Sequence, residues 1–174
     1  MRRVVTGTDV NGKSVFVSDG DVEPITLALL PGFAFHRVWG SDVPPVVPTA
    51  GDPPSHTGYF PPPGGWRFGF FTLGADERMV PEDVDVGDAL AEFTAKLPGM
   101  ADVMEVEHPG MHTTATVDLD LVLSGECWLE LDDGEEVLLG PGDCVVQNGT
   151  RHAWHNRTAE PCMLFVALLG AESG

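Results

Sequence analysis

The stretch that decides the fold reads His112-Thr113-Thr114-Ala115-Thr116-Val117-Asp118-Leu119-Asp120-Leu121-Val122-Leu123. Successive side chains of a β-strand point to opposite faces, so the odd and even positions form two separate sets. From Ala115 onward the odd positions are Ala, Val and Leu, which predicts a face packed in a hydrophobic core. The even positions from His112 to Asp120 carry imidazole, hydroxyl and carboxylate groups. This polar face either contacts water, as in many antiparallel sheets, or forms a site.

On both sides of this stretch the chain alternates short apolar runs with turns. Turns are expected at 124–125, 132–134 and 140–143, and strands at 113–123, 126–132, 135–139, 144–147, 153–156 and 162–169. Upstream, we expect a hairpin of residues 4–6 and 14–17 around Asn11-Gly12, strands at 25–30, 33–39, 67–73 and 102–107, and a helix at 88–97. In that helix Leu90, Phe93 and Leu97 share one face. Many short strands with regular turns predict an all-β sandwich or barrel.

A Pro-rich loop interrupts the strands at residues 40–65, where eight of the 15 prolines lie between Pro44 and Pro63. Proline lacks the backbone donor that a central strand needs, so this segment is expected to be a long surface connection. Loops of this length are often functional, which leaves a lid or a subunit contact as the alternative.

The chain is strongly acidic, with 27 Asp and Glu against nine Lys and Arg and a formal net charge of −18. Such a surface repels phosphate groups, which argues against nucleic acid and anionic membranes as partners. The longest apolar run, Met163–Leu169, is too short to span a membrane, and the first residues do not resemble a signal peptide. Three cysteines without CxxC spacing suit buried thiols in a reducing cytoplasm; one disulfide plus a reactive thiol is the alternative. We therefore expect a cytoplasmic protein.

Residues 109–169 resemble the cupin family, whose first motif runs His-x-His, then Glu, then Gly, and whose second contains Pro-x-Gly-x-x-His-x-x-x-Asn. The turn Pro141-Gly142-Asp143 belongs to the resemblance. It implies an antiparallel cupin β-barrel, also called a jelly roll or double-stranded β-helix. Residues 1–174 are then one cupin domain, in which 101–170 carry the barrel motifs. Residues 1–100 form an N-terminal extension of strands with the Pro-rich loop and one short helix.

The resemblance also assigns roles to single residues. His112 takes the place of the first histidine, Thr114 that of the second, and Asp118 that of the glutamate. His152 takes the place of the histidine of the second motif, with Asn156 four residues later. His112, Asp118 and His152 are thus the implied metal ligands, a set that suits divalent Fe, Mn, Ni, Co or Zn. Thr114 is a poor ligand and more plausibly supports a bound water or a substrate oxygen.

Two other histidines are candidates to replace the missing ligand. His155 lies three residues from His152, which in a strand puts it on the opposite face, so we discount it. His108 precedes the Pro109-Gly110 turn, which leaves room for it to fold inward. Separately, Asp118 and Asp120 share a face, and two carboxylates in one cavity raise one pKa, which suits a general acid or base.

The resemblance implies a metal-dependent enzyme of small-molecule metabolism, of the lyase or decarboxylase, isomerase or cyclase, or oxygenase type. Its candidate catalytic residues are Asp118, Asp120 and Thr114. The alternative is a non-catalytic barrel that binds a small ligand, which the missing histidine favours. Cupins often pair through their outer strands and N-terminal extensions, so a homodimer is also expected.

Overall fold

The structure is a computed structural model, and it describes residues 1–53, 55–77 and 82–172. The strands are β1 (Arg2–Thr8), β2 (Ser14–Asp21), β3 (Ala34–Ser41), β4 (Trp66–Leu73), β5 (Thr116–Ser124), β6 (Cys127–Glu130), β7 (Glu136–Leu139), β8 (Cys144–Asn148), β9 (Ala153–His155) and β10 (Cys162–Gly170). The helices are α1 (Val86–Lys96) and α2 (Met100–Val103), and a 3₁₀ turn covers Asp132–Gly134.

Two antiparallel sheets form the β-barrel. The larger sheet has the order β3-β4-β10-β5-β8 and the smaller one the order β7-β6-β9. Their inner faces meet in a core to which Val122 and Leu164 contribute from the larger sheet, and Cys127 and Leu129 from the smaller. The all-β, antiparallel jelly-roll prediction is confirmed.

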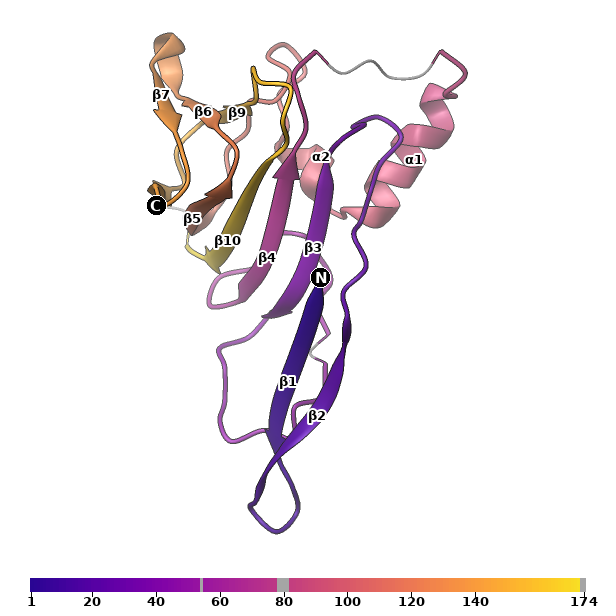
Figure 1. The fold of residues 1–174 in the computed structure, drawn as a ribbon, viewed down its shortest axis with the longest axis vertical. Coiled ribbons are helices and arrows are strands. Elements are labelled where there is room, and N and C mark those ends of the chain that lie inside the picture. The colour runs from indigo at the N-terminus through magenta and orange to yellow at the C-terminus, as the bar shows by residue number, and fades with distance from the viewer. Residues whose placement is uncertain (54, 78–81, 173–174) are drawn as a thin grey trace.

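Helix α1 covers one end of the larger sheet beside β3 (Figure 1). Asp85 caps it, since its side chain accepts a hydrogen bond from the Asp88 N–H, and the helix stops before Pro98-Gly99. Phe93 and Leu97 pack with Phe35 and Met100 in a second core cluster. This cluster closes the space next to the inner face of β3.

The N-terminal hairpin of β1 and β2 projects away from the barrel (Figure 1). Its turn passes through Gly12, whose φ of 79° explains the need for glycine. The hairpin is tied to the Pro-rich segment by a hydrogen bond from the Thr8 N–H to the Thr49 carbonyl oxygen. The predicted hairpin is thus present, with longer strands than the sequence indicated.

The predicted burial of strand β5 is wrong, because its two faces are exchanged. Thr116, Asp118 and Asp120 are buried, whereas Val117 and Leu119 are 38% and 40% exposed. The apolar set faces outward because it continues the apolar outer face of the larger sheet, where Leu119 pairs with Ala167 of β10 and Val146 of β8. The polar set faces into the barrel.

Several element predictions also need correction. Residues 102–107 were expected as a strand, but helix α2 covers Met100–Val103, so that Met100 reaches the core cluster beside Phe93. The expected strand at 25–30 is reduced to an isolated bridge between Ile25 and Phe35. The expected single helix is joined by α2.

Two burial predictions are wrong in part. Leu90 is 53% exposed, since the buried side of α1 is formed by Ala89, Phe93 and the following Leu97. The three cysteines are free thiols, of which Cys127 and Cys162 are buried, but Cys144 is exposed on the outer side of the barrel edge strand β8. Within the described ranges, no helix has the length and apolar character needed to cross a membrane.

Candidate functional site

His112 and His152 lie side by side although 40 positions separate them in the chain. Each donates its backbone N–H to the other's carbonyl oxygen, with N···O distances of 2.9 and 3.0 Å. The centroids of the two imidazole rings are 4.2 Å apart. This short antiparallel bridge lies outside the named strands and places both rings on the wall of one cavity.

Hydrogen bonds fix the proton of each imidazole. The Nδ1 of His112 is 3.0 Å from the Gly110 carbonyl oxygen, and the Nδ1 of His152 is 2.9 Å from that of Thr150. Because a carbonyl oxygen only accepts, both Nδ1 atoms carry the hydrogen and the lone pairs lie on Nε2. Burial lowers the pKa of both rings, and for His152 burial and the nearby His112 lower it to about 4. Both rings are therefore neutral near pH 7, the state in which imidazole binds a metal.

Asp118 and Asp120 reach the same cavity from the inner face of β5. Burial raises the pKa of Asp118 to about 6. Burial and the neighbouring Asp118 charge raise that of Asp120 to about 7. The Asp118 Oδ1 atom is buried without a hydrogen-bond partner among the described residues. A buried carboxylate oxygen without a partner is costly, and this one fits a cation or a hydrogen-bond donor that enters the cavity.

Thr114 also lines the cavity and is buried. Its Oγ1 lies 2.8 Å from the Oγ1 of Thr116, so one hydroxyl donates to the other. At the position where the resemblance expects a second histidine, the structure thus has a small hydroxyl that is already paired.

The cavity has a volume of about 390 Å³, within the usual range of small-molecule sites. Its polar lining includes Asp118 and Asp120 of β5, the two histidines and Asp76, and much of the remaining wall is aromatic. Tyr59, from the Pro-rich segment, contributes to this wall, and burial raises the pKa of its phenol, which stays protonated. No sequence signal singled out Tyr59.

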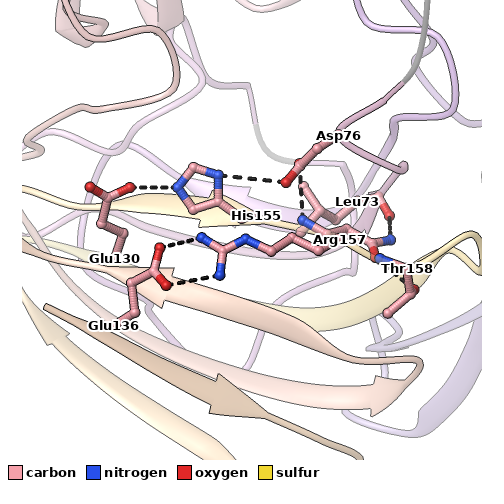
Figure 2. Close-up of polar contacts among 8 residues, drawn as sticks. Leu73, Asp76, Glu130, Glu136, His155, Arg157 and Thr158 are labelled. Atoms are coloured by element: carbon pink, nitrogen blue, oxygen red, sulfur yellow. Dashed lines mark hydrogen bonds and ion pairs between the residues drawn. The ribbon is translucent and has the colours of Figure 1, made fainter. Parts of the chain in front are cut away.

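His155 contributes to the cavity wall, but its imidazole does not join the His112 and His152 pair. Its Nε2 lies 2.6 Å from Glu130, and its Nδ1 lies 3.7 Å from Asp76, as Figure 2 shows. His108 ion-pairs with Glu105 at 3.1 Å and is 62% exposed. Neither histidine is therefore placed to supply the missing ligand.

A compact group of potential metal ligands lies on the smaller sheet. In the part of the chain that the structure describes, the ligand atoms of Glu130, Glu136 and His155 all lie within 4.8 Å of one another. Arg157 donates to both oxygens of Glu136, however, and Glu130 already accepts from His155 (Figure 2). Both carboxylates of this group therefore already have hydrogen-bond partners within the protein. His112, Asp118 and His152 share a cavity without forming so compact a group.

Asn156 holds the loop after β9 in place. Its side-chain nitrogen donates to the carbonyl oxygens of Leu73 and Glu160, and its side-chain oxygen accepts from the Thr158 N–H and hydroxyl. Its backbone N–H donates to Asp76. The asparagine of the second motif thus has a structural role, and it positions Asp76, which the sequence did not single out.

Comparisons with known proteins find sequence similarity to cupin domains. Residues 102–168 match the family model described as "Cupin domain". Oryzines biosynthesis cluster protein J of Aspergillus oryzae is 38% identical over 109 residues, 56% of this chain and 61% of that protein. The cupin-domain-containing oxidoreductase fogC of Aspergillus ruber is 40% identical over 67 residues, 36% of this chain and 32% of that protein. The matches thus span about three fifths and one third of these relatives.

Among solved structures, the cupin domain of Schizosaccharomyces pombe Cnp3 is similar, with a TM-score of 0.50 at 8% sequence identity. The match covers 97% of this chain and 87% of that one, and at this identity it shows the fold alone. The chain thus resembles the cupin family over residues 102–168, and the likeness to the Cnp3 domain agrees with a cupin fold.

Proposed function

We propose that this protein is a cupin and a metal-binding enzyme of small-molecule metabolism, and among the expected reaction types we favour an oxidation of the oxygenase kind. The names of two relatives support this choice, since one is a biosynthesis cluster protein and the other an oxidoreductase. The observation that carries the proposal is the pair of neutral imidazoles at the wall of a 390 Å³ cavity that also holds an unpartnered carboxylate oxygen.

His112, His152 and Asp118 are the residues proposed to hold the metal. Both Nε2 atoms keep a lone pair because Nδ1 is bound to a carbonyl oxygen, an arrangement that orients metal-binding histidines in general. The orphaned Asp118 Oδ1 offers a negative oxygen ligand. Two imidazoles and one carboxylate suit divalent Fe, Mn, Ni, Co or Zn, and such a metal supplies Lewis-acid or redox chemistry.

The chain's own residues provide the remaining functions. Asp120 is proposed to hold or move a proton at its carboxyl oxygens, because burial brings its pKa to about 7. Thr114 is proposed to position a substrate oxygen through its hydroxyl, and Asp118 to assist proton transfer when it is not bound to a metal. The aromatic walls exclude water from the substrate.

A non-catalytic ligand-binding barrel is the second candidate. The observation in its favour is Thr114, which stands at the position of a family ligand and is bound to Thr116 instead. The organisation of residues 1–174 as one domain, the homodimer and the cytoplasmic location remain predictions.

Metal titration tests the proposal. Purified protein freed of metal with EDTA is titrated with Co²⁺ and Zn²⁺ by calorimetry, and the wild type is expected to bind about one equivalent. His112→Ala and His152→Ala should each weaken binding by at least about 100-fold, which is about 2.7 kcal/mol. His108→Ala, an exposed histidine near the site, is the matched control and should bind as the wild type does. Equal affinity in all four proteins contradicts the proposed ligands.

A further inference from the structure

One wall of the cavity is a continuous row of aromatic rings. Phe33 contacts Phe71 at a centroid distance of 5.6 Å, and Phe71 stacks on Phe35 at 5.0 Å. Phe35 meets Tyr59 edge-on at 5.9 Å, and Tyr59 meets Phe60 edge-on at 5.0 Å. All five line the cavity, and such a surface favours flat, apolar ligands that stack on rings or meet them edge-on.

The charged groups of the cavity are acidic. Asp118 and Asp120 line it together with the partly exposed Asp76, and none of its described lining residues is Lys or Arg. A nearby cation, Arg37, lies over the Tyr59 ring at 5.6 Å and donates to the Lys96 carbonyl oxygen. Arg37 does not line this cavity. Its charge is therefore not available to pair with a ligand there.

An anionic ligand has to lose its hydration next to two carboxylates, which is unfavourable because like charges repel strongly in a partly buried site. A ligand with a hydroxyl or an amine instead supplies a hydrogen-bond donor to these carboxylates, of which Asp118 has an unpartnered Oδ1. Asp120 is not among the proposed metal ligands, so its carboxyl group is available to the ligand whether or not a metal is bound.

We propose that the cavity takes an aromatic small molecule without negative charge that donates a hydrogen bond from a hydroxyl or an amine to Asp120, and that without a metal it disfavours carboxylates and phosphates. This inference rests on the proposed function only in taking the cavity as the substrate site. It names the substrate class that the site selects.

Three indole compounds with the same ring test the inference. Tryptophol is neutral, tryptamine is a cation and indole-3-acetate is an anion. Their binding to EDTA-treated protein at pH 8.5 is measured by calorimetry and by ligand-observed NMR. Tryptophol and tryptamine are expected to bind at least about 10-fold more tightly than indole-3-acetate. Equal or tighter binding of indole-3-acetate overturns the inference, and so does the absence of binding by all three.

Variants test whether Asp120 causes the preference for the neutral and cationic compounds over the anion. Asp120→Asn keeps the shape and removes the charge, so tryptamine should bind about 10-fold more weakly and indole-3-acetate more tightly. Asp102→Asn, an exposed carboxylate in α2, is the matched control and should keep the wild-type order. If Asp120→Asn does not fold, Asp118→Asn provides the same comparison. An unchanged order in the Asp120 variant overturns the role of that residue.

The inference and the proposed function fail separately. A protein that binds no Co²⁺ or Zn²⁺ but ranks the three compounds as expected contradicts only the proposed metal site. A protein that binds metal at His112 and His152 but prefers indole-3-acetate in the metal-free state contradicts only the substrate class.

Discussion

His112 and His152 are joined through their backbones, each N–H donating to the other residue's carbonyl oxygen. The bridge that brings the two imidazoles together is thus independent of the side chains. The Nδ1 atom of each ring is hydrogen-bonded to a nearby carbonyl oxygen. The Nε2 atom of each ring is therefore available to bind a ligand.

The first prediction concerns the role of the His112 ring. In metal-free protein, His112→Ala should cost less than about 1 kcal/mol of unfolding free energy, because the backbone bridge remains. The adjacent Met111 is 5% exposed, and Met111→Ala should cost about 2–5 kcal/mol. Chemical denaturation in EDTA measures both. If His112→Ala costs as much as Met111→Ala, the ring is a structural residue and not a free ligand.

The second prediction concerns the pH dependence of stability. The folded state raises the pKa of Asp120 from 3.8 to about 7, so the protonated carboxyl is favoured in the fold. This contribution is fully present below about pH 4 and is lost as the pH rises through 7. Asp120→Asn should therefore stabilise the metal-free protein at pH 8, by at most about 4 kcal/mol, and by less than half as much at pH 5, at most about 1.6 kcal/mol.

Melting temperatures at the two pH values check this prediction, with the exposed Asp102→Asn as the control. A variant that melts lower than the wild type at pH 8 would show that the Asp120 carboxylate has a favourable partner in the folded state. The two aspartates titrate together, so the transition belongs to the pair Asp118 and Asp120.

The third prediction concerns Asn156, which is fully buried and makes four side-chain hydrogen bonds. Asn156→Ala leaves the carbonyl oxygens of Leu73 and Glu160 without this donor and should cost about 3–5 kcal/mol. Asn148→Ala, an exposed asparagine in β8, should be nearly neutral. Urea denaturation compares the two, and similar small costs would contradict the structural role assigned to Asn156.

The fourth prediction compares two glycines with similar positive φ angles. Gly125 and Gly134 have φ of 75° and 73°. A Cβ on Gly125 would lie 2.5 Å from the Pro161 carbonyl oxygen, whereas one on Gly134 meets nothing within 4 Å. Gly134→Ala should cost about 1–2 kcal/mol from the backbone alone, and Gly125→Ala about 1–3 kcal/mol more because Pro161 must move. Equal losses of stability in thermal denaturation would contradict the close packing at Gly125.

The fold was predictable from the sequence because turns and strand lengths are local signals. The direction in which a strand faces is not local: the alternation in β5 separates Val117 and Leu119 from Asp118 and Asp120, but it does not say which set is buried. Because apolar side chains usually face the core of a protein, the sequence predicts that Val117 and Leu119 are buried. The structure reverses this, since the barrel interior contains a polar cavity and the outer face of the sheet is apolar.

The candidate site was predictable only through the family motifs. Nothing in the spacing of His112 and His152 shows that they pair, and the resemblance supplied that contact. Tyr59 and Asp76 have no motif and reach the cavity wall through long-range packing, which one sequence does not reveal. The aromatic residues of the row look in the sequence like ordinary core residues, so the sequence alone does not show that they line a cavity.

The last prediction concerns the outer face of the larger sheet, an apolar surface that includes Leu119, Val146 and Leu169, at 40%, 60% and 50% exposure. Neighbouring strands in register place these side chains together, and monomers rarely expose such a surface. If a second copy covers it, as expected for a homodimer, Leu119→Glu should convert a particle of twice the chain mass into a monomer, because buried like charges would oppose association. Val10→Glu, at the fully exposed hairpin turn, is the control and should leave the mass unchanged. Sedimentation equilibrium measures the mass, and a wild-type chain that stays monomeric well above micromolar concentration contradicts the homodimer.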